Sequence, residues 1–483
     1  MMKKALTAGL GIAVGAAVFA CGSCLGWMGD LSLQAIGALG VLSCCIVWWI
    51  AGLFPEFVTA LIMAAAFVVG CQVPTTTVFS AFASSTWWLL VAAFALGFGM
   101  QKSGLMARMA AAVLRIFPNT FNMQAAGLIA TGTLVGPFIP SLSAKATMLA
   151  PLSLGISDSL GYERKGRQAT GLFLAMFTGI RTVGPAVISS SIIGYGLLAT
   201  LPADVAAQFP MANWFLHMLP WFVFVMVANY VAIVLMFGPG RSKARSKPAS
   251  ANPADGASAA SAKKSASSKI FPRTPMTSAE KRMAAIMGIC VLLWVTEPLH
   301  AVPSHIVAIA AMVAMLAFGV VDAKQLRQGI AWDSLIFIGC VLGLADVFAA
   351  LGIDRWIIGS CTPAFAALAQ NPYLFVVGIC VATIALRFVI VSEMAYINIF
   401  MAFMVPVALT LGINPWVIGV CVYAVVNPWF VLYQNPIYLS AYYATEGKMA
   451  KQSSSAAYCA VYLAICIAGL LVSIPLWQSL GLM

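Results

Sequence analysis

The chain has 483 residues, of which 62% are hydrophobic and 8% are charged, and its mean hydropathy is +0.97. This composition leaves too little polar surface for a soluble domain and predicts an all-α polytopic membrane protein. The net charge of +12 does not indicate a nucleic-acid partner, because the basic residues lie mainly in the short segments between apolar stretches.

About eleven apolar stretches are long enough to cross a hydrocarbon core of roughly 30 Å. The first follows Met1–Lys4 and is similar to a signal peptide, but we expect it to be retained as an N-terminal helix within residues 1–32. In chain order the stretches are 6–27, 33–54, 57–73, 87–101, 168–198, 212–238, 283–299, 303–320, 334–351, 414–444 and 456–480.

Two further apolar regions, 121–158 and 371–410, contain proline and polar residues near their centres. Each is too long for one span and too interrupted for one straight helix. Because non-helical backbone is tolerated at membrane depth only where protein or a water-filled cavity surrounds it, we predict two re-entrant helical hairpins.

Basic residues of the connecting segments fall on one side of this predicted topology. The positive-inside rule makes that side cytoplasmic, which places the N-terminus in the cytoplasm and the protein in the cell inner membrane. Residues 239–282 are rich in Ala, Ser, Pro and Lys without apolar periodicity, and we predict a disordered cytoplasmic linker.

The linker separates two comparable halves, 33–238 and 283–483, and each half holds one hairpin that closes with a proline, Pro151 or Pro406. With five spans per half, the second copy is inverted relative to the first. Inverted repeats with broken helices are typical of secondary transporters, which bind substrate near the bilayer midplane.

Lys145 and Arg181 are predicted at membrane depth, where charge is costly and indicates function. Three roles stay open for Lys145: binding a substrate carboxylate, replacing a sodium ion as a tethered cation, or extending toward the cytoplasm along its own stem. Arg181 lies in a predicted helix break at 179–185. It suits bidentate contact with a carboxylate, sulfonate or sulfate, or capping of exposed carbonyls.

Arg387 is the third basic residue at this depth, and we expect it to pair with Glu393 or Asp346. Glu393 is the one acid at a predicted hairpin tip. A structural hydrogen-bonding role and proton coupling both stay open for it.

Neutral oxygen donors near the second hairpin suit a hard monovalent cation, and one sodium site there is plausible from Ser392, Asn398, Gln434 and Asn435. Paired carboxylates, phosphate-binding loops and metal-ligand clusters are missing from the sequence, which therefore predicts no enzyme and no cofactor beyond sodium as a coupling ion. Cys21 and Cys24 have metal-like spacing but lack further ligands.

This layout resembles the divalent anion:sodium symporter family, whose members carry dicarboxylates, citrate or sulfate. In that family each hairpin tip carries Ser-Asn-Thr. Counting back from the two prolines puts the corresponding triplets at Ser141-Leu142-Ser143 and Tyr396-Ile397-Asn398, after a lead-in Ser392-Glu393-Met394-Ala395 that looks like Thr-Glu-Phe-Ala. Broken helices after the hairpins correspond to 179–185 and to Tyr433-Gln434-Asn435-Pro436.

The resemblance implies two sets of site residues. The expected substrate-binding set is Ser141, Ser143, Lys145, Arg181, Thr182, Tyr396, Asn398 and Asn435. The expected cation-binding set is Ser392, Ala395, Asn398, Gln434, Gly179 and Gly184. Both tip asparagines of the family, which contribute to its two sodium sites, are replaced here by Leu142 and Ile397.

We therefore expect a cation-coupled secondary active transporter of small divalent anions (dicarboxylate, citrate, sulfate or sulfonate) with an elevator-type mechanism. The resemblance also implies a homodimer through spans 33–73 and 283–320. A sodium-independent anion exchanger and a proton symporter are also compatible with the sequence. Outside carrier transport, so are an anion channel lined by Lys145 and Arg181, and a membrane sensor that signals through the linker.

Overall fold

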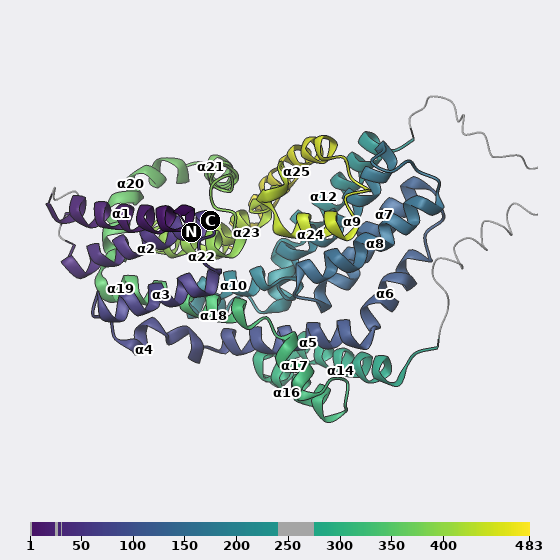
Figure 1. The fold of residues 1–483 in the computed structure, drawn as a ribbon, viewed down its shortest axis with the longest axis horizontal. Coiled ribbons are helices and arrows are strands. Elements are labelled where there is room, and N and C mark those ends of the chain that lie inside the picture. The colour runs from purple at the N-terminus through teal and green to yellow at the C-terminus, as the bar shows by residue number, and fades with distance from the viewer. Residues whose placement is uncertain (1, 25–27, 30, 240–274) are drawn as a thin grey trace, which may run out of the picture.

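The computed structural model describes residues 2–24, 28–29, 31–239 and 275–483, which form helices joined by short segments (Figure 1). These ranges contain no strand. Most of the predicted linker lies outside the described residues. Its last part does not: Thr277 begins a helix with a capping box, so residues from Ser278 onward are helical rather than linker.

The first half of the chain contains two helix breaks, one between residues 135 and 142 and one between residues 186 and 192. Its elements are α1 (Met2–Cys24), α2 (Leu33–Ala51), α3 (Glu56–Val69), α4 (Thr75–Val78), η1 (Ser80–Ala83), α5 (Ser85–Ser103), α6 (Leu105–Leu114), α7 (Phe121–Val135), η2 (Gly136–Phe138), α8 (Leu142–Ser159), α9 (Arg167–Ala186), η3 (Ile188–Ser190), α10 (Ile192–Thr200), α11 (Ala203–Ala206) and α12 (Met211–Phe237).

The second half repeats the pattern of a helix pair followed by a broken helix. Its elements are α14 (Ser278–Val295), α15 (Glu297–His300), α16 (Ser304–Ala317), α17 (Ala323–Gly329), α18 (Trp332–Leu342), α19 (Leu344–Leu351), α20 (Ile353–Ala369), α21 (Pro372–Leu386), α22 (Glu393–Thr410), α23 (Pro415–Val425), η4 (Leu432–Gln434), α24 (Pro436–Ala444) and α25 (Gln452–Ser479).

Local sequence explains several helix boundaries. Ser84 caps α5 by accepting a hydrogen bond from the backbone N–H of Trp87, and α5 ends at Gly104, whose φ of +83° favours glycine. The chain then bends by 69° into α6. A polar cap at one end and a left-handed glycine at the other thus fix both ends of this helix.

Every predicted span contains helix. Among the described residues, six helices are long and apolar enough to cross a membrane, and the bent pair α5 and α6 makes a seventh. Four shorter apolar helices, α3, α16, α21 and α23, have 10–17 residues. The number of eleven spans therefore stays a prediction, whereas a chain with many apolar helices is plain from the structure.

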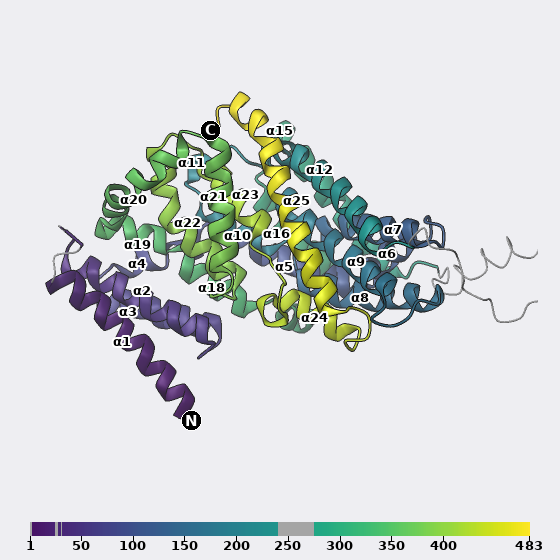
Figure 2. The ribbon, with the colours of Figure 1, turned by 90° about the horizontal axis from the view of Figure 1, so that it is seen from above.

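The helices gather into two regions that are visible from both directions (Figures 1 and 2). At one end α1 packs against α2, and the N-terminal part of α1 projects from the body. At the other end α7 and α12 pack against α9, and α12 packs against α25. Helices α10, α22 and α23 lie between these ends.

Each predicted hairpin range holds two helices with a short connection. We call α7, η2 and α8 hairpin 1, and α21 and α22 hairpin 2. Hairpin 1 precedes a broken helix made of α9, η3 and α10, and hairpin 2 precedes one made of α23, η4 and α24. Helix α9 is buried from Ala169 to Ala186 and α23 along its whole length, so the broken helices form the centre of the fold.

Candidate functional site

Lys145 lies in the first turn of α8, which Ser141 caps by accepting a hydrogen bond from the backbone N–H of Ala144. Its side chain is fully buried. The ammonium Nζ donates to the carbonyl oxygen of Ser190 at 2.6 Å, to the Ser190 hydroxyl at 3.1 Å and to the carbonyl oxygen of Gly136 at 3.5 Å. The interpretation that Lys145 extends toward the cytoplasm is therefore wrong, because the ammonium is bound between η2 and η3.

The break in the first broken helix lies later than predicted. Residues 179–185 are helical, and the break runs from Val187 to Ser191. Pro185 explains the position: it has no N–H to donate to the carbonyl of Arg181 and disrupts the helix, which ends one residue later. The buried triplet Ser189, Ser190 and Ser191 then supplies the backbone and hydroxyl groups at the break.

Gly179 and Gly184 allow close packing. A Cβ atom on Gly179 would lie 2.6 Å from the carbonyl oxygen of Ile129 on α7, and one on Gly184 would lie 2.8 Å from the hydroxyl of Tyr423 on α23. Both glycines therefore have a packing role, and their predicted part in cation binding stays a prediction.

Arg181 on α9 forms a buried ion pair with Glu393, the first residue of α22, with 2.9 Å between Nη2 and Oε2. The side chains are 1% and 6% exposed. Arg181 Nε and Nη1 and Glu393 Oε1 have no hydrogen-bond partner among the residues that the structure describes. A buried guanidinium that uses one of its nitrogens leaves the others available to an anionic ligand.

Arg387 connects hairpin 2 to the second broken helix. Its Nε donates to the carbonyl oxygen of Val426 at 2.6 Å and its Nη2 to that of Gln434 at 3.1 Å, while Nη1 donates to the carbonyl of Ile390. Arg387 makes no ion pair with Glu393 or Asp346, so the expected direct pairing is wrong, and Glu393 interacts with Arg387 only through space. Glu393 binds Arg181, and Asp346 accepts a hydrogen bond from Ser80 at 2.5 Å.

The two halves thus share one arrangement. In each, a fully buried basic side chain from a hairpin donates to carbonyl groups where the following helix is broken: Lys145 to Ser190, and Arg387 to Val426 and Gln434. Broken helices expose carbonyl oxygens that need a cation or a donor. Here the protein supplies both cations itself. A tethered cation was one of the three roles that the sequence left open for Lys145, and the corresponding role of Arg387 was not foreseen.

The second hairpin tip lies one turn earlier than proline counting placed it. Ser392 caps α22 through the backbone N–H of Ala395, so Tyr396, Ile397 and Asn398 belong to the helix and not to the tip. The Tyr396 hydroxyl donates to the Thr383 hydroxyl on α21 at 3.2 Å, so the Tyr396 side chain lies between the two helices of hairpin 2. The N-cap serine, rather than the distance to the proline, decides where the helix begins.

Asn435 and Gln434 are occupied by structural contacts. Asn435 caps α24 through its Oδ1, and its Nδ2 donates to the carbonyl oxygen of Asn427 at 3.2 Å. Gln434 Oε1 accepts the backbone N–H of Phe430 at 3.0 Å. These oxygens already have donors, which disfavours them as cation ligands.

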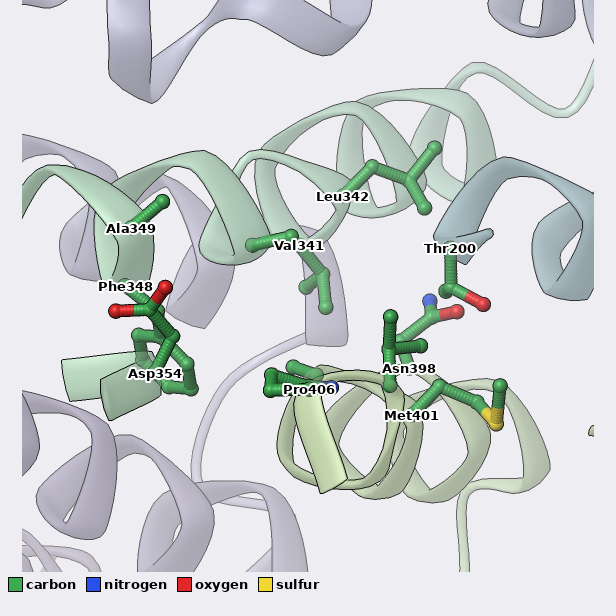
Figure 3. A pocket seen from close by; sticks show the side chains of 12 residues that line it. Thr200, Val341, Leu342, Phe348, Ala349, Asp354, Asn398, Met401 and Pro406 are labelled. Carbon is green, nitrogen blue, oxygen red and sulfur yellow. The ribbon is translucent and has the colours of Figure 1, made fainter. Parts of the chain in front are cut away.

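The remaining predicted residues separate into different environments. Thr182 is buried beside Arg181, with no partner for its hydroxyl among the described residues, whereas Ser143 is exposed on α8. Asn398 lines a cavity together with Thr200 (Figure 3). The structure therefore brings Arg181, Thr182 and Glu393 together, with Lys145 close enough to interact electrostatically with Arg181, whereas Asn398 lines the cavity beside Thr200.

Comparison with protein families gives one match. The family model described as the sodium:sulfate symporter transmembrane region matches residues 9–483. Two curated relatives are dicarboxylate transporter 2 of spinach chloroplasts (Spinacia oleracea), 24% identical over 72% of this chain and 62% of that protein, and the inner membrane protein YbhI of Escherichia coli, 26% identical over 68% of each. A membrane protein of Cupriavidus necator is 23% identical over 62% of this chain.

The aligned part spans between about half and two thirds of the length of these relatives. Two solved membrane transporters share the fold. The YdaH transporter of Alcanivorax borkumensis aligns with a TM-score of 0.60 over 90% of this chain and 98% of its own, at 14% identity. MtrF of Neisseria gonorrhoeae gives a TM-score of 0.54 over 88% and 94%, at 15% identity. The prediction of an all-α polytopic membrane protein is confirmed.

Proposed function

The chain belongs to the family of sodium:sulfate symporter transmembrane proteins. On that basis we propose that it is a secondary transporter of small divalent anions, and that it exchanges them without sodium. The observation that carries this proposal is the pair of tethered cations at the two helix breaks, Lys145 and Arg387. It favours sodium-independent exchange over the cation-coupled symport that the family resemblance implied.

The resemblance implied a sodium ion at each hairpin tip, and the residues here do not fit one. At hairpin 1 the carbonyl oxygens of Ser190 and Gly136 accept hydrogen bonds from an ammonium group, and Leu142 replaces the asparagine ligand. A sodium ion beside the Lys145 ammonium would add a second positive charge a few ångströms away, in a low dielectric where like charges repel strongly.

The same reasoning applies to hairpin 2. The guanidinium of Arg387 donates hydrogen bonds to the carbonyl oxygens of Val426 and Gln434, which a coupling cation would need as ligands. Asn435 and Gln434, the neutral donors expected for a sodium site, have bonded oxygens. Fixed positive charges at both places would remove the requirement for a coupling ion.

Charge also favours a dianion and exchange. Among the described residues of the hairpins and broken helices, the buried basic side chains are Lys145, Arg181 and Arg387, and the buried acid is Glu393. These three basic side chains and one acid leave an excess of positive charges in the hairpins and broken helices, which Glu56 on α3 offsets in part through its electrostatic interaction with Arg387. A divalent anion would neutralise them, and an empty carrier that moves through the membrane with this charge would face a large desolvation cost. The carrier would therefore move back across the membrane readily only with an anion bound, which is exchange.

Arg181 and Thr182 are the proposed substrate contacts. The free Nε and Nη1 of Arg181 suit a carboxylate, sulfonate or sulfate oxygen, and the Thr182 hydroxyl next to it is without a partner in the described chain. Glu393 would hold the guanidinium in place from hairpin 2. Substrate binding and the position of the hairpin are then linked through one ion pair.

Proton symport and an anion channel have less support than exchange. Proton symport through Glu393 is disfavoured because its carboxylate is paired with Arg181. A channel lined by Lys145 is disfavoured because the ammonium binds backbone carbonyls. We further propose an elevator-type movement of the hairpins and broken helices and a homodimer, both by analogy with the family. We also propose an inner-membrane location with a cytoplasmic N-terminus, from the distribution of basic residues.

Proteoliposomes with the purified full chain test the proposal. Uptake of radiolabelled succinate, malate, citrate or sulfate is measured with internal counter-substrate alone, with a sodium gradient alone, and with a proton gradient alone. We expect saturable uptake that needs counter-substrate and is unchanged when potassium or choline replaces sodium. Uptake that needs sodium and no counter-substrate would refute the exchange proposal.

A further inference from the structure

A cavity of about 170 Å³ lies between hairpin 2 and the helices α18, α19 and α20 (Figure 3). Helix α22 forms one wall through residues that include Asn398 and Met401, and α18 and α19 form the opposite wall through residues that include Leu342 and Phe348. Asp354 at the start of α20 and Thr200 at the end of α10 complete the lining. At about 30 Å³ per water molecule, the volume corresponds to roughly six waters.

The polar groups of this cavity lack partners. Asn398 is 1% exposed, and within the described chain neither its Oδ1 nor its Nδ2 has a hydrogen-bond partner. The buried Oδ1 of Asp354 has none there either. Native structures leave few buried polar atoms unsatisfied, so the cavity that these two side chains line is suited to contents that carry hydrogen-bonding groups.

Most polar atoms at this cavity accept hydrogen bonds. Asp354 lies in the first turn of α20, where the free N–H groups of the helix stabilise a negative charge. Pro406 lines the cavity within α22, and because proline has no N–H, the carbonyl of Ala402, four residues earlier, loses its helical donor. The Thr200 hydroxyl donates to Leu197, so its free lone pairs also accept.

The lining disfavours an anion. Its twelve residues include an acid and no Lys, Arg or His, and Arg181 and Lys145 are not among them. A divalent anion would meet the Asp354 carboxylate without a compensating cation. The chemistry of this cavity therefore differs from that of the proposed substrate site.

We propose that this cavity binds a small organic cation, a primary ammonium group on a short apolar chain with a hydroxyl at its far end. The ammonium pairs with Asp354, the methylene groups pack against Phe348 and Ala402, and the hydroxyl reaches Asn398. Such a ligand neutralises the partly buried carboxylate of Asp354 and supplies the donors that the acceptors need.

The cavity has a route of entry. A larger hollow of about 780 Å³ shares Thr200, Leu342, Ala345 and Val405 with it. Because a bound ligand contacts α22 on one side and α18 to α20 on the other, it would hold hairpin 2 against these helices. Inhibition of exchange is therefore a second consequence, and this part alone rests on the proposed function.

Binding is measured on the purified full chain by isothermal titration with 4-amino-1-butanol, and 1,4-butanediol serves as the uncharged control. We expect saturable binding of the amine and at least about tenfold weaker binding of the diol, because the diol cannot form a charge-assisted hydrogen bond with Asp354. Asp354→Asn should weaken amine binding by a similar factor. Asp333→Asn, on α18 and outside the cavity lining, should leave it unchanged.

Ala402→Leu provides a test that keeps the acid, because the larger side chain fills the cavity and should abolish binding. Equal amine binding by wild type and Asp354→Asn, displacement of the amine by succinate, or no saturable binding would each overturn the site. The readout is binding rather than flux, so it stands whether or not anion exchange is observed. If exchange is present, the amine should inhibit it in wild type but not in Asp354→Asn.

Discussion

The ammonium nitrogen of Lys145 lies 2.6 Å from the carbonyl oxygen of Ser190, inside the break between α9 and α10. In the second half, the Nε of Arg387 lies 2.6 Å from the carbonyl oxygen of Val426, where α23 ends. Both contacts join a hairpin to the broken helix that follows it. This matched pair of cations is the basis of the proposal that the chain needs no sodium at these two places.

Replacement of Lys145 by Met should abolish sodium-independent exchange. The substitution keeps the length of the side chain but removes the ammonium, so the Ser190 and Gly136 carbonyls lose their donor and the site loses one positive charge. We expect at least about a tenfold drop in counterflow of labelled succinate. Lys102→Met, at the exposed end of α5, is the control. Normal counterflow by Lys145→Met would contradict the proposed role.

The Arg181 and Glu393 pair gives a prediction that separates stability from transport. Arg181→Gln leaves a buried carboxylate unpaired, which costs about 3–5 kcal/mol, so the melting temperature in detergent should fall markedly. The double variant Arg181→Gln with Glu393→Gln removes both charges and should recover most of that stability. It should still fail to transport, because the anion contact is lost. Transport by the stable double variant would exclude Arg181 as a substrate ligand.

Much of the architecture could be predicted from the sequence because it follows from the lipid that surrounds the chain. Long apolar stretches must become helices in lipid, and interruptions by proline and polar residues mark where those helices break. The ranges of both hairpins follow from this logic. Their exact tips depend on local capping instead: Ser141 and Ser392 begin α8 and α22, whereas counting back from Pro406 placed the second tip at Tyr396-Ile397-Asn398.

The partners of the charged residues could not be predicted in the same way. The ion pair between Arg181 and Glu393 joins positions that are 212 residues apart in the sequence. Arg387 donates to the backbone carbonyls of Val426 and Gln434, and a backbone carbonyl is the same for every residue type, so the sequence does not mark it. Sequence patterns identify which charges are buried. Which group each one meets depends on how the two halves pack.

Packing of hairpin 1 against α9 depends on glycine. A Cβ atom on Gly179 would lie 2.6 Å from the Ile129 carbonyl oxygen, a rigid backbone atom. Gly179→Ala should therefore destabilise the protein by about 1–3 kcal/mol through overpacking and lower its melting temperature. Gly155→Ala is the matched control, since a Cβ atom there meets nothing within 4 Å. Equal melting temperatures for the two variants would contradict this, because they would show that α7 and α9 move apart at little cost to make room for the added methyl group.

An ion pair outside the apolar core connects the two halves and makes stability depend on pH. Arg108 on α6 binds both carboxylate oxygens of Glu280 in the first turn of α14, at 2.9 and 3.0 Å. The hydrogen bond from Arg108, with that from the Thr277 backbone, lowers the pKa of Glu280 below its ordinary value of about 4.3.

Because the pKa of Glu280 is lowered in the folded state, its stabilisation is complete above the ordinary carboxyl pKa and is lost as pH falls through the lowered value. Glu280→Gln should cost about 1 kcal/mol near pH 7, and the difference in melting temperature from wild type should shrink as the pH falls below the ordinary carboxyl pKa of about 4.3. Lys448 and Glu446 form an exposed pair, and Glu446→Gln should change the melting temperature little. A wild-type advantage that stays constant across this pH range would mean that Glu280 acts through its helix cap and packing rather than through its charge.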